Sequence, residues 1–255
     1  MSYFTHLNHA ALLSPTTHNG DVSDQLESIY RRLLQLHQII QPKLRKNNID
    51  LHANLNNEGE VCFSSVASPH DNQLMALSYS RSQNQAQIVE SVMGREPGAI
   101  EPRCHPTIEV RVTPAGGAIE LILTSDARYD QQNFAGKMTI ANQRDAFYDL
   151  INDLQGNYRL GFWSGTHLDE QMSLSSGHMP PPYILYEWLE TFAAGRDFLR
   201  IGVWYDAADD ALTEDNIIKV IFDHIRELSA IYDFIAWNSN NDFHKFYDVQ
   251  AVRVR

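Results

Sequence analysis

The stretch HPTIEVRVTPAGGAIELILT, residues 105–124, decides the fold predicted from this sequence. Apolar and polar residues alternate on both sides of a glycine-containing turn, which is the two-residue period of β-strands. If Ala115-Gly116 makes the turn, Arg111 lies opposite Glu120, a favourable cross-strand pair. The other face of this hairpin is apolar and consists of Ile108, Val110, Val112, Ile119, Leu121 and Leu123. We therefore predict an antiparallel hairpin at about 105–124 as the centre of a sheet.

Shorter patterns on either side of the hairpin predict further strands and helices. Strands are expected at 60–67, 72–80, 157–163 and 197–207. Amphipathic helices are expected at 83–94, 142–156, 183–195 and 213–237, and a first helix from its N-cap at Ser23 to Pro42, which should end or kink it. Residues 125–138 have the composition of a polar segment and 164–182 that of a long loop. The fold class expected is α+β, with a mixed, mostly antiparallel sheet packed by several helices.

Nothing in the chain resembles a linker between domains. No stretch rich in Gly, Pro or Ser separates two halves, and no period of 20–50 residues repeats. We expect a partly ordered N-terminal arm at 1–20 and a single α+β domain at 21–255. Three histidines of the arm, His6, His9 and His18, are expected to be solvated rather than to bind a metal.

The composition is that of a globular protein, with 43% hydrophobic and 20% charged residues. A formal net charge of −12 argues against non-specific coating of nucleic acid, because that binding depends on neutralising phosphates. The N-terminus lacks the pattern of a signal peptide, and no run of about 18 apolar residues predicts a membrane helix. Two cysteines, Cys62 and Cys104, fit a reducing compartment. We expect a cytoplasmic protein without a membrane partner.

Three segments carry a resemblance to a known family. They are IIQPKLRKNNIDLHANL at 39–55, CFSSVASPHDNQLMALSYSRS at 62–82 and HPTIEVRV at 105–112. Their order resembles that of the motifs in the YktB-like bacterial proteins, in which a helix ending in a Pro-Lys-type step precedes a short strand pair and a central strand. The resemblance covers about 39–125. It implies an α+β fold and, since the family's activity is uncharacterised, no catalytic residue.

Charged and amide side chains gather at the open end of the hairpin and just after it. In one interpretation, Arg111, Arg128 and Lys137 hold a phosphate or carboxylate with the help of Asn133. His105 or Asp130 would then transfer a proton. In the other interpretation, the same side chains form a structural network that ties a loop to the sheet, since Asp and Arg also serve in turns and caps.

Two other groups of residues have chemical potential. His167, Asp169, Glu170 and His178 have the right types for a divalent metal but no recognised spacing, so neither a metal nor a cofactor is predicted. Aromatic residues around Trp163, Trp188, Trp204 and Trp237 suit either a ligand cleft or, as is more usual, a hydrophobic core.

The signatures of P-loop, dinucleotide-binding, zincin and α/β-hydrolase proteins are absent. We therefore expect a binding or accessory protein that contacts a protein partner through a sheet edge or an acidic C-terminal face. Within 206–233, eight acidic residues stand against Lys219 and Arg226. The alternative is an enzyme that acts on an anionic small molecule or phosphoester through the residues near 105–137. A second copy of the chain is a further candidate partner.

Overall fold

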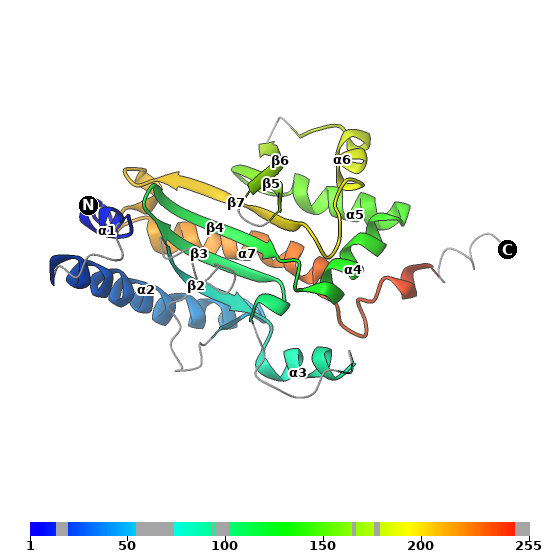
Figure 1. Cartoon of the computed structure of the whole chain (residues 1–255), viewed down its shortest axis with the longest axis horizontal. Coiled ribbons are helices and arrows are strands. Elements are labelled where there is room, and N and C mark those ends of the chain that lie inside the picture. The colour runs from blue at the N-terminus through cyan, green and yellow to red at the C-terminus, as the bar shows by residue number, and fades with distance from the viewer. Residues whose placement is uncertain are drawn as a thin grey trace. The chain divides into compact units, whose positions relative to one another are not determined.

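A computed structural model gives the fold and describes residues 1–13, 20–54, 74–92, 94, 102–164, 167–175 and 179–247. The strands form a sheet of seven in the order β1-β2-β3-β4-β7-β5-β6, and α-helices alternate with them along the chain (Figure 1). The β1–β2, β2–β3 and β5–β6 pairs are antiparallel. The predicted α+β class is therefore confirmed.

The described strands are β1 (His52–Ala53), β2 (Met75–Ser80), β3 (Thr107–Thr113), β4 (Gly116–Leu123), β5 (Asn157–Ser164), β6 (His167–Ser175) and β7 (Phe198–Asp206). The α-helices are α1 (His6–Ala11), α2 (Gly20–Lys46), α3 (Gln83–Val92), α4 (Arg128–Met138), α5 (Ala141–Asn152), α6 (Pro182–Leu189) and α7 (Ile217–Ile235), with short 3-10 helices at Pro102–Cys104 and Asp210–Leu212. Within the ranges given above, none of these helices has the length and apolar character needed to cross a membrane.

Contacts along the chain cluster into two compact units. Unit 1 consists of Met1–Ser82, Thr107–Glu120 and Gly202–Arg226, and unit 2 of Gln83–Pro106, Leu121–Ile201 and Glu227–Arg255. The chain passes from one unit to the other within β4, β7 and α7, so the units are not successive stretches of sequence. The prediction of a single domain at 21–255 stays a prediction.

The hairpin forms, with its turn one residue earlier than expected. Strand β3 ends at Thr113 and β4 begins at Gly116, so Pro114 and Ala115 make the turn in place of Ala115-Gly116. Gly116 is needed for another reason: a Cβ there would lie 2.0 Å from the backbone oxygen of Tyr205 in β7. The glycine thus permits the close approach of a neighbouring strand.

Both faces of the hairpin are buried, although the sequence alternates. The expected apolar face is confirmed: its six residues are at most 4% exposed. On the other face, Thr107, Glu109 and Glu120 are fully buried and Arg111 is 9% exposed. The predicted pair is also confirmed, since Arg111 Nη1 lies 2.8 Å from Glu120 Oε2. The polar face of the β3–β4 hairpin is therefore buried in the protein interior and does not face solvent.

The two longest helices follow their predicted apolar stripes. Every fourth or third residue of α2 is fully buried, namely Ile29, Leu33, Leu36, Ile40 and Leu44. Of the two outcomes expected at Pro42, an end or a kink, the end is wrong, because α2 continues to Lys46 with the proline inside it. Burial of Leu44 one position beyond Ile40 in the stripe favours the extra turn over the hydrogen bond that proline removes. Asn48 then ends the helix in a left-handed conformation, with φ of 56°.

The N-terminal residues are packed as part of unit 1. Helix α1 has a capping box at Thr5, and Phe4 and Leu12 are buried. The expectation that His9 is solvated is wrong: it is 3% exposed, and its Nδ1 lies 2.7 Å from the backbone oxygen of Thr113. His6 is exposed, as expected, and His18 lies outside the described residues.

Two expected irregular segments contain regular structure. The polar segment 125–138 contains α4, and the loop 164–182 contains β6, which pairs with β5 from Asn157↔Ser175 to Ser164↔His167. Apolar periodicity did not predict helix α4, because most of its buried side chains are polar. The remaining expected strand, 60–67, lies outside the described residues.

Gly202 in β7 provides a test of the packing of the buried polar face in unit 1. A Cβ at this position would lie 2.5 Å from the backbone oxygen of Ile119 and 2.8 Å from Glu120 Cγ. We expect Gly202→Ala to lower the free energy of unfolding by about 2 kcal/mol, measured by urea denaturation, because backbone cannot move aside. Gly117→Ala is the matched control, since its Cβ would meet the Leu212 side-chain methyl groups at 3.2 and 3.3 Å and the nearest backbone atom, the Arg111 oxygen, only at an ordinary contact distance of 3.7 Å. Equal losses for the two variants would contradict this account.

Candidate functional site

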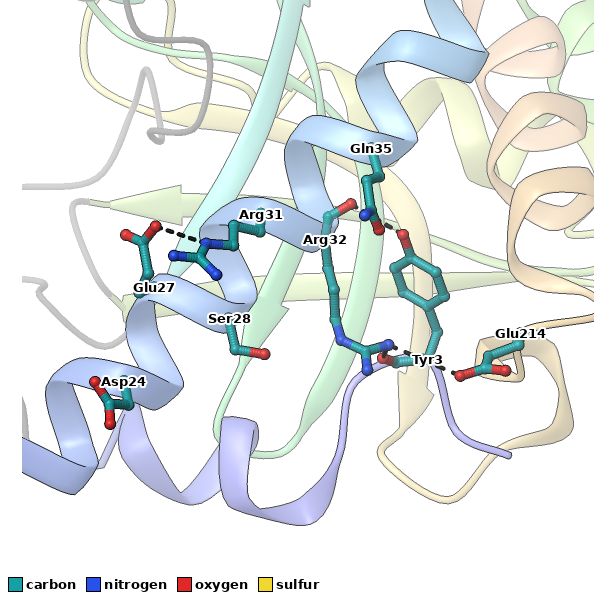
Figure 2. Close-up of a pocket in the computed structure, with 8 residues that line it drawn as sticks. All are labelled: Tyr3, Asp24, Glu27, Ser28, Arg31, Arg32, Gln35 and Glu214. Carbon is teal, nitrogen blue, oxygen red and sulfur yellow. Dashed lines mark hydrogen bonds and ion pairs between the residues drawn. The ribbon is translucent and has the colours of Figure 1, made fainter.

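Unit 1 contains an open polar pocket of about 540 Å³ between the N-terminal residues and the first turns of α2 (Figure 2). Its lining side chains carry both signs of charge and are those of Tyr3, Asp24, Glu27, Ser28, Arg31, Arg32, Gln35 and Glu214. This volume is in the range of pockets that hold small ligands. The sequence analysis did not predict this pocket, because its residues come from three separate parts of the chain.

Arg111, one of the predicted anion-binding residues, is held by two carboxylates in unit 1. Its Nε lies 3.3 Å from Glu109 Oε2, and its Nη1 lies 2.8 Å from Glu120 Oε2. Glu109 also accepts a hydrogen bond of 2.7 Å from Ser78 Oγ in β2. The guanidinium therefore neutralises buried carboxylates of the sheet, which is a structural use of its charge.

In unit 2, three predicted site residues lie on one face of α4 and bind the C-terminal end of α7. Asn133 Nδ2 donates to the Ile235 carbonyl at 3.0 Å, and Lys137 Nζ donates to the Phe234 carbonyl at 2.6 Å. Asp130 Oδ1 accepts from the backbone N–H of Trp237, just beyond the helix, at 2.6 Å. The last carbonyls of an α-helix have no partner within the helix, so these side chains cap α7.

The segment after α7 folds back onto the same face of α4. Phe243 N–H donates to Asn133 Oδ1 at 2.9 Å. The Phe243 ring packs so closely on Gly136 that a Cβ at this position would lie only 2.3 Å from the ring atom Cδ2. Asn241 accepts from Lys137 Nζ and donates to three carbonyls at the end of α7, those of Asp233, Phe234 and Ala236. The lysine also lies 4.3 Å from the centre of the Phe234 ring. One lysine and two asparagines thus hold this C-terminal segment in place.

His105 is a buried titratable group of the predicted site. It is 2% exposed, with Nδ1 at 3.8 Å from Asp130 Oδ2 and Nε2 at 3.8 Å from Glu90 Oε1 of α3. These distances are too long for hydrogen bonds but short enough for electrostatic attraction when the ring is protonated. The structure therefore places His105 and Asp130, the two alternative proton-transfer groups, beside one another where both are buried.

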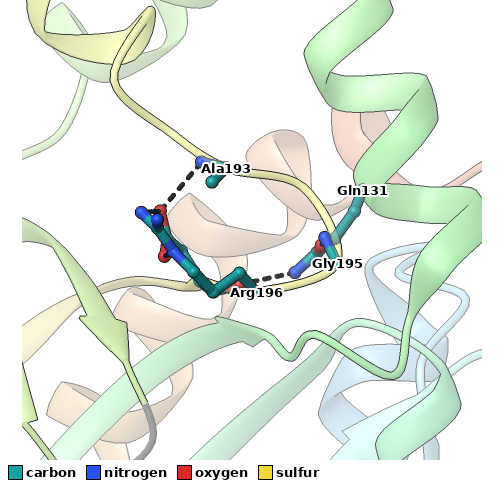
Figure 3. Close-up of polar contacts among 5 residues, drawn as sticks. Gln131, Ala193, Gly195 and Arg196 are labelled. Atoms are coloured by element: carbon teal, nitrogen blue, oxygen red, sulfur yellow. Dashed lines mark hydrogen bonds and ion pairs between the residues drawn. The ribbon is translucent and has the colours of Figure 1, made fainter.

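A second polar network in unit 2 holds the turn before β7 (Figure 3). Gln131 of α4 donates to the backbone oxygens of Thr124 and Asp197, both at 2.7 Å, and accepts from Gly195 N–H. Asp197 also pairs with Arg196, whose Nε lies 2.6 Å from Asp197 Oδ1. Burial alone raises the pKa of Asp197, but hydrogen bonds from Arg196 and the Ala193 N–H outweigh it and hold the pKa below its usual value. Gln131 is fully buried and was not among the residues predicted to form the site, because a single glutamine in a polar segment carries no recognisable pattern.

Arg128 is the one predicted site residue that is exposed. No partner for it is found in the part of the chain that the structure describes. The others divide between the two units: His105, Asp130, Asn133 and Lys137 belong to unit 2 and Arg111 to unit 1. The spacing of 130, 133 and 137 is that of one helix face, a signal that was present in the sequence.

The other two groups of candidate residues differ in what can be said of them. Side chains of His167, Asp169, Glu170 and His178 lie outside the description. Elsewhere, among the described residues, no group of three or more His, Cys, Asp or Glu side chains is placed to hold a metal ion. The core interpretation of the aromatic residues is supported in unit 2, where Phe162 stacks on Trp188 with ring centres 4.1 Å apart. Comparison with protein-family models gives no match and comparison with curated proteins gives none either, so the YktB-like resemblance stays a prediction.

The capping of α7 by Asn133 is testable by truncation. Asn133→Ala removes the hydrogen-bond donor of the Ile235 carbonyl and the acceptor of the Phe243 N–H at the same time. Both backbone groups would then lack this partner in the folded protein. We expect the free energy of unfolding to fall by about 2 to 3 kcal/mol. Gln132→Ala, at the exposed neighbouring position, should change it by less than about 0.5 kcal/mol. A loss at position 133 no larger than that at 132 would rule out the capping role.

The buried lysine predicts a dependence of stability on pH. Burial lowers the pKa of Lys137 from 10.5 to about 8. Between these pH values the unfolded chain binds more protons than the folded one, so this group makes stability rise with pH. From pH 8 to pH 10, we expect the free energy of unfolding of the wild type to rise by about 1 to 3 kcal/mol more than that of Lys137→Met, as measured by urea denaturation.

Lys245→Met is the control for this measurement, because Lys245 is an exposed lysine of the same unit. Its stability should follow that of the wild type across the same pH range. If Lys137→Met shows the same pH slope as the wild type, the lysine is not buried in the folded protein.

Proposed function

We propose that this protein is a binding or accessory protein that acts by contact with a protein partner, through an acidic surface of unit 1. We define the acidic surface as the exposed residues Asp206, Asp209, Asp210, Glu214 and Asp215. No Lys, Arg or His lies between 206 and 218. Glu214 is paired with Arg32 at 3.9 Å, so the exposed charge of the four aspartates is the observation that carries the proposal. It favours a partner with a basic contact surface.

The position of Trp204 supports a protein partner. Trp204 and Asp206 lie two apart on β7, and both are exposed, so they share one face of the strand. The indole is 38% exposed. Tryptophan is enriched among the residues that dominate binding energy in protein interfaces, where it serves as an apolar anchor within a polar rim.

The contacts of the predicted chemical residues also support binding over catalysis. Asn133 and Lys137 are used to cap α7, and Arg111 is held by Glu109 and Glu120. Side chains committed to such bonds are not available to hold a substrate. The alternative, an enzyme acting on an anionic small molecule or phosphoester, is favoured by one observation, the placement of His105 between two carboxylates.

Charge reversal tests the proposal. The protein is purified by a tag from the cell that makes it, after chemical cross-linking, and its partners are quantified by mass spectrometry. We expect a stoichiometric protein partner that binds the triple variant Asp209→Lys/Asp210→Lys/Asp215→Lys at least tenfold less than the wild type, with cross-links to Lys- or Arg-rich segments of the partner.

The matched control reverses three exposed acidic residues of unit 2, as Asp153→Lys/Glu187→Lys/Glu190→Lys. This variant changes the net charge by the same amount and should keep the partner. If no partner is recovered with the wild type, or if the acidic-surface variant retains it fully, the proposed function is refuted.

A further inference from the structure

We infer that the polar pocket of unit 1 is a subsite for a positively charged side chain, an arginine or a lysine, of the partner's basic segment. This inference rests on the proposed function and adds to it a defined cavity that selects one side chain. The pocket is contiguous in sequence with the acidic surface, since Glu214 belongs to both.

Both guanidinium groups of the pocket are already committed to neighbours in the protein. Arg31 Nε lies 2.9 Å from Glu27 Oε1, as Figure 2 shows. Arg32 donates to the backbone oxygen of Tyr3, its guanidinium carbon stands 5.2 Å from the Tyr3 ring centre, and its Nη1 is 3.9 Å from Glu214 Oε1. These contacts satisfy the positive charges of the lining.

Acceptors of the pocket remain available. Asp24, Ser28 and Gln35 line it without a partner among the residues that the structure describes. The lining carries three carboxylates against two guanidinium groups, so its net charge is negative. A guanidinium ligand presents five N–H donors and an ammonium ligand three, and both need carboxylate, hydroxyl and amide oxygens of this kind.

The surroundings favour a cation further. Asp209, Asp210 and Asp215 are exposed within six residues of Glu214. Within a Debye length of about 8 Å at physiological salt, such charges attract a basic segment and repel an anion. The positive charges of Arg31 and Arg32 are each partly balanced by a carboxylate, Glu27 and Glu214, whereas Asp24 offers a cation a carboxylate that no described residue pairs with.

The experiment measures binding of a fluorescent hexa-arginine peptide to the full chain by fluorescence anisotropy. We expect Asp24→Asn/Glu214→Gln to weaken this binding at least fivefold, and the matched control Asp149→Asn/Glu190→Gln, which neutralises two exposed acids of unit 2, to leave it unchanged. In the wild type, agmatine, a small guanidinium compound, should shift the NMR signals of the Gln35 side-chain amide, whereas inorganic phosphate should not. Equal thermal unfolding midpoints of the two variants would show that both are folded.

The outcomes separate this inference from the proposed function. If the pocket variant binds hexa-arginine as tightly as the wild type, or if phosphate rather than agmatine shifts the Gln35 signals, the pocket is not a subsite for a cation. Loss of the partner by the Asp209, Asp210 and Asp215 variant would still uphold the proposed function. Failure of that variant to lose the partner would refute the function itself.

Discussion

The burial of the C-terminal end of α7 is the constraint on which unit 2 depends. A helix end carries carbonyl groups that no residue of the helix can bond, and burying them without partners costs about 1 to 3 kcal/mol each. Here the hydrogen-bond donors come from α4 and from Asn241. The buried side chains of α4 are therefore mostly polar, because apolar side chains in their place would leave the carbonyls of α7 without partners. The low apolar content of α4 and the position of the C-terminal segment both follow from this requirement.

The same requirement explains which parts of the fold could be predicted from sequence. Helices α2 and α7 bury apolar stripes, and the hairpin buries an apolar face, so periodicity revealed them. Helix α4 buries Asp130, Gln131, Asn133 and Lys137, which a test for apolar periodicity reads as solvent-exposed. The predicted turn of the hairpin is one residue too late, because it places Gly116 within the turn. The glycine is instead required by the close approach of β7, which is distant in sequence.

The candidate site shows a limit of a different kind. Asp, Asn, Lys and His are the residues that catalysis uses, and they are also the residues that cap helices and satisfy buried backbone groups. The sequence analysis grouped Asp130, Asn133 and Lys137 in one polar segment, but only the three-dimensional structure shows that they share a helix face and meet a helix end. The pocket of unit 1 was beyond sequence reasoning because Tyr3, Gln35 and Glu214 have no local pattern in common.

The interleaving of the two units has a consequence for how the chain is made. Unit 1 combines residues 1–82 with residues up to Arg226, and unit 2 combines residues from Gln83 with Glu227–Arg255, so on a ribosome each set of contacts waits for residues more than a hundred positions further along. Strand β3 can pair with β2 and β4 early, whereas the neighbour of β4 on its other side is β7, about eighty residues later. Long-range pairing of this kind slows folding and leaves a strand edge open in the nascent chain.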